Sequence, residues 1–490
     1  MIAFREEPAA ILARLRTLRE ADAPTHGGHV LSYVYDPDDE RIDALAAEAM
    51  RIAQPVNWLD PMTFPSAAAV ERDVLGFVRG LLHGGEDVVG TLTTGGTESC
   101  LLAVKAARDA WLRAHDAVPG AARPRLVAPT TVHAAFQKGA DYLGLELDLV
   151  PVGPDGRVPA ERIADRLASS DDVALVVVSA PSYPFASLDP VVEVAAITAA
   201  AGVPLHVDAC VGGLVLPFWP ELPAWDFRVP GVTSMSADLH KYGYAPKGVS
   251  VLLQRGRDRQ RHQFFATTRW PGYPVVNPTI LGSRSTAAAA AAWAIIQALG
   301  EEGYRERAGV ARRATDAIRA AVEGIDGLRI VGAPVGPMLA AATDETVPVG
   351  RRVDPHRWTD AVHRRGFAIQ QQPSMPQPDG SRLPGTAHLT VTPVTARVLD
   401  ELLPALADAA DEVRGVPRAS AEALLGALPP MAGPIDSDTA GALLAAIGIG
   451  GGRLPDDQAS LLAGIEALPS QLAERLLIEM VGRIAEPAQA

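Results

Sequence analysis

The sequence predicts an α/β protein: a mainly parallel β-sheet covered by helices on both faces, followed by a smaller α+β domain. One observation is that apolar runs alternate with helical stretches from about residue 66 to 255. Another is that these runs are almost continuous in Val and Leu, which is typical of strands buried on both faces. The third is the length of 490 residues, which indicates two or three domains.

The predicted strands of the sheet are seven apolar runs: VVGTLTT, RLVAP, ELDLVP, VALVVVSA, VPLHVDA, VTSMSA and VSVLLQ. Helices are predicted between most of them, at 97–116, 132–143 and 189–201. Ligands of such sheets bind at the carboxyl ends of the strands. The residues that directly follow the strands are therefore the candidates for a functional site.

Four segments are expected along the chain. Residues 1–55 form an N-terminal helical arm, with a turn-rich strip around THGGHVLSYVYDPDD between two helices, and residues 56–304 form the large domain. Residues 305–414 form the small α+β domain, which starts with a long Arg/Ala-rich helix and contains LRIVG, DPHRWTDAVHRRG and TAHLTVTPVT. Residues 415–490 form a C-terminal extension of amphipathic helices.

The composition limits the classes of partner. Hydrophobic residues make up 48% and charged residues 21%, as in an ordinary soluble protein. The net charge of −14 argues against a nucleic acid or an anionic membrane, since both attract basic surfaces, while a local basic pocket for a small anion stays open. The opening segment MIAFREEPAAILARLRTLREAD is too charged for a secretory or membrane segment. The run AAAAAAWAIIQALG is shorter than the ~20 residues of a membrane span, so we expect a buried helix there.

The two cysteines, Cys100 and Cys210, form neither a CxxC pair nor a zinc pattern. We therefore expect free thiols in a reducing cytosol, hence a cytoplasmic protein, and no metal site.

Lysine is rare in this chain, and two of its four lysines lie in the segment SADLHKYGYAPKG. Lys241 follows the predicted strand VTSMSA and precedes VSVLLQ. This position fits a lysine that forms a Schiff base with an aldehyde, and desolvation and nearby charge favour the loss of a proton that its amine needs. The plain alternative is an exposed loop lysine.

The segment TTGGTES follows another predicted strand and starts a helix. Gly95 and Gly96 permit a tight turn, the free N–H groups of the first helical turn suit a phosphate, and Thr97 adds a hydroxyl donor. The pattern is neither GxGxxG nor GxxxxGK[ST], so a dinucleotide or ATP is not favoured. A simple helix cap is the alternative.

Two further residues follow strands. His133 lies near a helix start, where a capping or core role is usual, but its imidazole could stack on a planar ligand. Asp208 ends the strand VPLHVDA. It either binds nearby backbone N–H groups or, beside a protonated ring nitrogen, stays ionised and holds that proton. A phosphate cradle, a stacking ring, a carboxylate and an amine together match pyridoxal 5′-phosphate.

At this point the residues resemble a known family. TTGGTESCLLAVKAARD, TVHAAFQKGADYLG, HVDACVGGLVLPF, SADLHKYGYAPKG and NPTILGSR resemble sphingosine-1-phosphate lyase and its prokaryotic relatives, in the group II decarboxylase-like branch of fold-type I pyridoxal phosphate enzymes. The resemblance covers roughly residues 25 to 410, and the tail after 415 lies outside it. It implies a fold-type I architecture and a homodimer with active sites at the subunit interface.

The resemblance also implies roles for individual residues. Lys241 would carry the cofactor, Asp208 would pair with its ring nitrogen, and His133 would stack on the ring. The cofactor phosphate would be held by Gly95, Gly96, Thr97, Ser236 and His240.

On the substrate side, the resemblance places Tyr244 and Lys247 near the substrate, with Lys247 as a candidate for binding an anionic group. Tyr33 and Tyr35, from the N-terminal strip, would approach the partner's site.

One departure from the family pattern bears on the substrate. Where the lyases typically read N-P-L-H-P-x-x-F-P, with a histidine that helps to bind the substrate phosphate, this chain has NWLDPMTFP, which puts Asp60 in that place. A carboxylate repels a phosphate monoester. We therefore expect a substrate that is not a phosphorylated sphingoid base.

The leading functional prediction is a pyridoxal phosphate-dependent carbon–carbon lyase that acts on a polar small-molecule amine, for example a β-hydroxy amine. Lys241, Tyr244 or a phosphate-bound water could take the hydroxyl proton. The alternative is an amino-acid α-decarboxylase, which needs a group that binds the substrate carboxylate; Arg284 and Arg382 are the candidates. A catalytically silent cofactor-binding partner is the third hypothesis.

Overall fold

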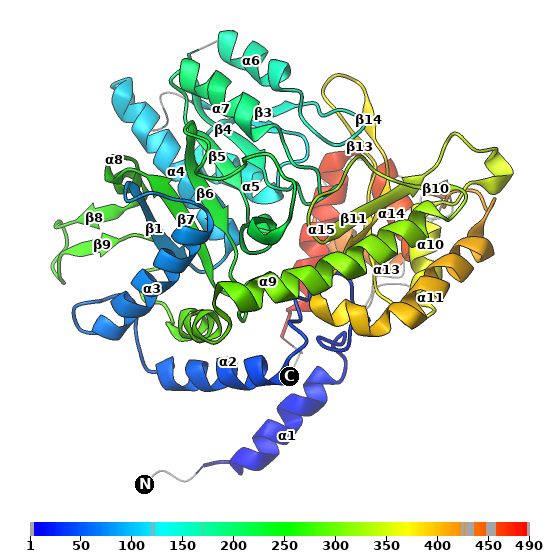
Figure 1. Ribbon diagram of the computed structural model, residues 1–490, viewed down its shortest axis with the longest axis horizontal. Coiled ribbons are helices and arrows are strands. Elements are labelled where there is room, and N and C mark those ends of the chain that lie inside the picture. Colours follow the sequence, from blue (N-terminus) through cyan, green and yellow to red (C-terminus); the bar gives the residue numbers. More distant parts are fainter. Residues whose placement is uncertain are drawn as a thin grey trace.

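The structure of the protein is a computed structural model in which two sheets, with their helices, lie side by side (Figure 1). It describes residues 4–118, 120, 123–169, 171–422, 426, 436–446 and 457–487. The larger sheet positions the site, and the smaller one lies beside the carboxyl-terminal part of the chain.

The larger sheet has seven strands in the order β1-β7-β6-β5-β4-β2-β3. The strands β2 to β6 run parallel, and β7 is antiparallel to both β1 and β6. Each of the seven predicted runs forms one strand, so this prediction is confirmed: β1 Val88–Thr93, β2 Arg125–Pro129, β3 Glu146–Val150, β4 Val173–Ser179, β5 Leu205–Asp208, β6 Val232–Ala237 and β7 Ser250–Arg255.

Helices cover both faces of this sheet, which explains why its inner strand β4 is apolar on both faces. Val127 and Val176 belong to one apolar cluster, together with residues of α3, α7 and α9. Their neighbours Leu126 and Leu175 belong to another, together with residues of α4 and α5. Successive side chains of a strand point to opposite faces, so both must be apolar here. The helices of this domain are α3 Pro65–Leu81, α4 Gly96–Ala114, α5 Ala134–Leu143, α6 Ala160–Ala168, α7 Val191–Ala200 and α8 Arg257–Gln260.

The small domain follows a 37-residue helix, α9 Ala287–Glu323, which is kinked at Gly300, where φ is +53°. The run AAAAAAWAIIQALG lies in α9 and is largely buried, as predicted. The domain contains an antiparallel sheet in the order β10-β11-β15-β12 and the helices α10 and α11. Their bounds are β10 Leu328–Ile330, β11 Met338–Thr343, α10 Pro355–His363, β12 Gln370–Gln372, β15 Thr386–Thr390 and α11 Leu399–Val413.

Two features of this domain differ from the expected elements. The strand β11 was not predicted, because its sequence MLAAAT lacks the β-branched residues and the alternation that mark a strand. The expected boundary between residues 304 and 305 falls inside α9, shortly after the kink at Gly300. Two short hairpins complete the strands: β8 Phe265–Thr267 with β9 Val275–Asn277, and β13 Met375–Pro376 with β14 Arg382–Leu383.

The described parts of the arm and of the tail contain helices, as predicted. In the arm, α1 Pro8–Arg19 projects from the body and buries none of its residues, while α2 Glu40–Ala53 packs against α9 (Figure 1). In the tail, α13 Ser437–Ala446 and α15 Ser470–Ile484 share an apolar cluster. The third tail helix, α14 Gln458–Ala467, lies against α10. Over the described residues, each helix is too short or too polar to cross a membrane.

Candidate active site

A cavity of about 620 Å³ lies at the carboxyl edge of the larger sheet. It contains residues that follow β1, β2, β5 and β6, which is where a ligand of a parallel sheet is expected. Seven of the predicted residues line it together, although they lie far apart in the sequence: Gly95, Gly96, Thr97, His133, Asp208, His240 and Lys241.

Lys241 forms a buried ion pair that the sequence did not reveal. Its Nζ lies 3.0 Å from Oδ2 of Asp238, and the two side chains are 18% and 2% exposed. Burial opposes the charge of Lys241, but Asp238, together with Cys210, Tyr35 and Asp208, outweighs it, so the pKa of Lys241 is raised well above its usual value. Burial likewise disfavours the carboxylate of Asp238, but the charges of Lys241 and His240 lower its pKa below the usual value. Without a cofactor the amine is thus held as an ammonium, whereas we expected its surroundings to favour proton loss.

Asp208 makes hydrogen bonds through one carboxylate oxygen. Oδ1 accepts from the backbone N–H of Cys210 at 3.0 Å and from the hydroxyl of Ser236 at 3.1 Å. Oδ2 accepts no hydrogen bond from the described residues. Asp208 therefore anchors the chain after β5 and keeps one oxygen for a ligand that donates a proton.

Ser236 does not line the cavity. It is fully buried, and its hydroxyl contacts Nε2 of His206 at 3.2 Å and Sγ of Cys210 at 3.3 Å. Burial lowers the pKa of His206 to about 4, so this ring is neutral. Ser236 therefore contacts Asp208 from the protein interior and does not line the cavity with the phosphate loop.

The cysteines are free thiols, as expected. Both are buried close to Asp208, and burial raises the pKa of the Cys100 thiol. Burial also raises the pKa of Cys210, together with a hydrogen bond to Cys100, which is the largest cause. The sulfur atoms of the two cysteines and one carboxylate oxygen of Asp208 lie within 4.8 Å of one another. Two protonated thiols and one carboxylate make a poor metal site, because metals bind the thiolate.

The phosphate loop has the backbone that its sequence predicts. Gly95 has φ of +149° and directly precedes α4, so the first N–H groups of this helix face the cavity side. A Cβ at Gly96 would lie 2.6 Å from the carboxylate of Asp238, so a side chain is excluded there. Glu98 fixes the loop, because it accepts hydrogen bonds from the N–H groups of Thr94 at 2.6 Å and of Ile280 at 2.7 Å.

His133 is the N-cap of α5: its Nδ1 accepts from the N–H of Ala135 at 3.2 Å. This is the capping role considered from the sequence, and the same ring also lines the cavity. His240 lies beside the loop, with Nε2 at 3.5 Å from Asp238. Its Nδ1 and Oδ1 of Asp238 are buried without a hydrogen-bond partner among the described atoms. The unpartnered Nδ1 of His240 beside a glycine-rich helix start fits a polar, phosphate-bearing ligand such as pyridoxal phosphate.

The predicted substrate residues lie outside the lining of this cavity. Tyr244 is buried with φ of +59° and stacks on Tyr304 at 6.1 Å, and burial raises its pKa. Lys247 donates to the carbonyl of His240 at 3.0 Å and lies 4.7 Å above the ring of Tyr35. Burial and the charge of Lys241 lower the pKa of Lys247 to about 8. Tyr35 is therefore near Lys247 of its own chain, and Tyr33 is 67% exposed.

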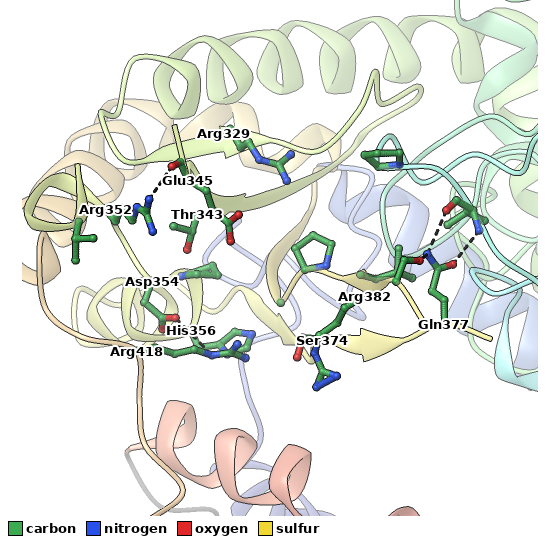
Figure 2. Close-up of a pocket in the computed structure, with 18 of the residues that line it drawn as sticks. Arg329, Thr343, Glu345, Arg352, Asp354, His356, Ser374, Gln377, Arg382 and Arg418 are labelled. Carbon is green, nitrogen blue, oxygen red and sulfur yellow. Dashed lines mark hydrogen bonds and ion pairs between the residues drawn. The ribbon is translucent and has the colours of Figure 1, made fainter. Parts of the chain in front are cut away.

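Asp60 and the two arginines have other contacts. Asp60 caps the turn before α3, accepting from the hydroxyl of Thr63 at 2.6 Å. Arg284 is buried, donates to the carbonyl of Leu92 at 2.9 Å and lies 4.1 Å from the ring of Trp58. Arg382 lines a different cavity (Figure 2). Among the described residues, no arginine lines the cavity at the sheet edge.

The small domain contributes to this region through a contact that no local pattern signals. The hydroxyl of Tyr183, which lines the cavity, donates to Oε1 of Gln370 on β12 at 2.5 Å. The ring of Tyr183 also lies 4.4 Å from that of His388 on β15. Tyr183 of the large domain therefore connects the cavity to two residues of the small domain.

Two family descriptions match the chain. Residues 25–331 match the pyridoxal-dependent decarboxylase conserved domain. Residues 386–483 match a second description, pyridoxal-dependent enzyme, C-terminal putative HTH domain. The tail after 415 lies outside the decarboxylase-domain match, as expected, and has this second match of its own.

Individual proteins agree with this result. The chain is 37% identical to the sphingosine-1-phosphate lyase of Dictyostelium discoideum over 318 aligned residues. This alignment covers 64% of this chain and 59% of that protein. The chain is 34% identical over 330 residues to a probable L-tyrosine/L-aspartate decarboxylase of Methanothrix thermoacetophila, covering 66% and 82%. Among solved structures, the sphingosine-1-phosphate lyase of Burkholderia pseudomallei is similar with a TM-score of 0.75 and 32% identity, covering 84% of this chain and 93% of that one.

The motifs, the fold-type I architecture and these similarities agree on the cofactor, which is pyridoxal 5′-phosphate. The chain belongs to the pyridoxal-dependent decarboxylase family, and within it to the branch that resembles sphingosine-1-phosphate lyase.

Proposed function

We propose that this protein is a lyase that cleaves a carbon–carbon bond of a small-molecule amine. The observation that carries the proposal is the buried pair of Lys241 and Asp238 in the same cavity as the glycine-rich loop and Asp208. When bound, pyridoxal phosphate withdraws electrons from a bond at the carbon that carries the substrate amine.

We assign the following roles to the chain's own residues. The N–H groups after Gly95 and the hydroxyl of Thr97 bind the phosphate, and His133 stacks on the ring. The free oxygen of Asp208 holds the proton of the ring nitrogen. Lys241 attaches the cofactor, and Asp238 controls the proton on its amine.

The remaining proton transfer concerns the substrate hydroxyl. Tyr244 is buried against Tyr304 away from the cavity, and its raised pKa makes it a poor base. Lys241, once released, lies in the cavity with a carboxylate 3.0 Å away to receive or return a proton. Among the bases considered, the geometry favours Lys241.

An α-decarboxylase is the second candidate, because the matched domain and the Methanothrix relative carry that name. A decarboxylase must orient the substrate carboxylate, for which a guanidinium is the usual partner. Within one chain the described lining of the cavity contains no arginine, so a decarboxylase would need a guanidinium from the second subunit.

We also propose that the substrate carries no phosphate. Asp60 stands where the lyases typically have a phosphate-binding histidine, and hydrogen bonds from Thr63 and Met62 lower its pKa, so it stays ionised. Asp60→His should then increase the use of a phosphorylated amine relative to its dephosphorylated form. An unchanged preference would count against this assignment.

A cytoplasmic homodimer is the assembly that we propose. Ile11, Leu12, Leu15 and Leu18 of α1 are between 43% and 69% exposed, and apolar surface of this kind favours an interface. Ile280 and Leu281 are also exposed and lie at the cavity, which fits a site completed by a second subunit.

Two buried free thiols agree with a reducing compartment. We keep the four segments 1–55, 56–304, 305–414 and 415–490 as the proposed units of the chain.

The test is the visible spectrum of the purified protein followed by product analysis. A Schiff-base band that disappears in Lys241→Ala supports the site, and aldehyde release from β-hydroxy amines supports the reaction. Carbon dioxide without aldehyde would favour the decarboxylase. A colourless protein that cannot be reconstituted with pyridoxal phosphate would exclude both enzymes.

A further inference from the structure

A second cavity, of about 750 Å³, lies where the small domain meets the large one (Figure 2). Its walls come from the segment after β3 and from α6, from β10 and β11, from the start of α10, from the β13–β14 hairpin and from the segment 415–418. It shares no described lining residue with the cavity that contains Lys241. Its volume is in the range of small-molecule sites.

The lining of this second cavity is basic, although the chain as a whole has a net charge of −14. Five arginines line it, against three acids. The arginines are Arg162, Arg329, Arg352, Arg382 and Arg418, and the acids are Glu345, Asp354 and Asp379.

Two of the arginines are neutralised within the protein. Arg162 lies 2.9 Å from Asp379, and Arg418 lies 2.8 Å from Glu466 of α14. These pairs tie the walls of the cavity to each other and to the tail.

The other three guanidinium groups have no ion pair with the described residues. Arg352 donates only to the backbone carbonyls of Val347 and Glu345. Arg329 and Arg382 make no side-chain hydrogen bond in the described part of the chain. They lie on β10 and β14, separated by 53 positions in the numbering, yet both line this cavity (Figure 2). The hydrogen bonds from Thr346, followed by the charges of Arg329 and Arg352, lower the pKa of Asp344, but its carboxylate forms no ion pair with either arginine.

We propose that this cavity binds a small anion carrying two or more phosphate or carboxylate groups. Guanidinium groups bind such groups through paired, charge-assisted hydrogen bonds. Three of them without a carboxylate partner among the described residues can serve more than one anionic group, and the volume exceeds the needs of a single phosphate.

The test is isothermal titration calorimetry of the full-length protein loaded with pyridoxal phosphate, so that the phosphate loop of the active site is occupied. Pyrophosphate and citrate are the probes, because they present the two kinds of anionic group on small molecules. We expect one site per chain for at least one probe. We also expect Arg329→Gln with Arg382→Gln to weaken its binding by about a hundredfold or more, since two arginines are replaced and each lost charge-assisted hydrogen bond costs about a factor of ten.

The matched control is Arg312→Gln on α9, an exposed arginine that does not line the cavity. It should bind the probe like the wild type. Because neither target arginine has a side-chain partner in the described protein, the double variant should keep its circular dichroism spectrum; if it does not fold, the two single variants are compared instead. No heat with either probe, or unchanged affinity in the arginine variants, would overturn the proposal.

Discussion

Asp238 should control the reactivity of Lys241, and replacing it with Asn tests the chemistry of the site most directly. The two charged groups are 3.0 Å apart and nearly removed from water. At an effective dielectric constant of ~20, two unit charges at that distance attract each other by about 5–6 kcal/mol. Losing one partner of a buried pair typically costs about 3–5 kcal/mol.

The direction of the effect follows from the pKa of Lys241. In the wild type Asp238 raises this pKa against the opposing effect of burial. In Asp238→Asn only the smaller effects of Cys210, Tyr35 and Asp208 oppose burial, so the pKa falls and more of the amine is neutral at pH 7. With ~1.4 kcal/mol for each factor of ten, the neutral fraction should rise by about two to three powers of ten.

The assay is the rate at which the cofactor-free protein incorporates pyridoxal phosphate, followed by absorbance as a function of pH. The midpoint of the rate profile should move to lower pH in the variant. Asp109→Asn is the matched control, because Asp109 pairs with Lys105 at 2.8 Å on α4, outside the cavity; its profile should match the wild type. A midpoint at or above that of the wild type in Asp238→Asn would refute this account of Lys241.

Three other predictions follow from the structure. Glu98→Gln should weaken pyridoxal phosphate binding by about tenfold or more in a cofactor titration, because Glu98 accepts from the N–H groups of both Thr94 and Ile280 and each bond to a charged group contributes ~1.5–3 kcal/mol. In the cofactor-free protein, Lys247 should react with an acetylating reagent with a midpoint near pH 8, since burial and the charge of Lys241 lower its pKa to about 8; peptide mass spectrometry follows the reaction, and a midpoint near the ordinary lysine value of ~10.4 would contradict the prediction. Glu466→Gln should lower the thermal stability by about 1–3 kcal/mol, because this carboxylate accepts from the N–H and the hydroxyl of Ser374 and pairs with Arg418; an unchanged melting temperature would show that α14 does not depend on these contacts.

The sequence was most informative where one local rule governed the structure. The strands of the larger sheet could be predicted because each must be apolar on both faces, and the phosphate loop because its glycines directly follow a strand. Asp238 lies in the very segment that drew attention to Lys241. Its role depends on a turn that brings it back to the lysine three residues later, and sequence periodicity does not report such a turn. Gln370 could not be predicted to reach Tyr183, because the two residues are 187 positions apart and in different domains.

Arginine also shows that the sequence does not reveal contacts between distant residues. This chain uses lysine only four times and arginine in its place. With arginine nearly everywhere, its presence in a segment carries little information, and Arg284, a candidate for binding the substrate, instead packs on Trp58. What distinguishes Arg329, Arg352 and Arg382 is the lack of a carboxylate partner in the described structure and their position around one cavity. Both properties arise only when separate strands and loops come together. A binding function built from a common residue is thus visible in the fold and not in the sequence, whereas one built from a rare residue, such as Lys241, can be recognised in both.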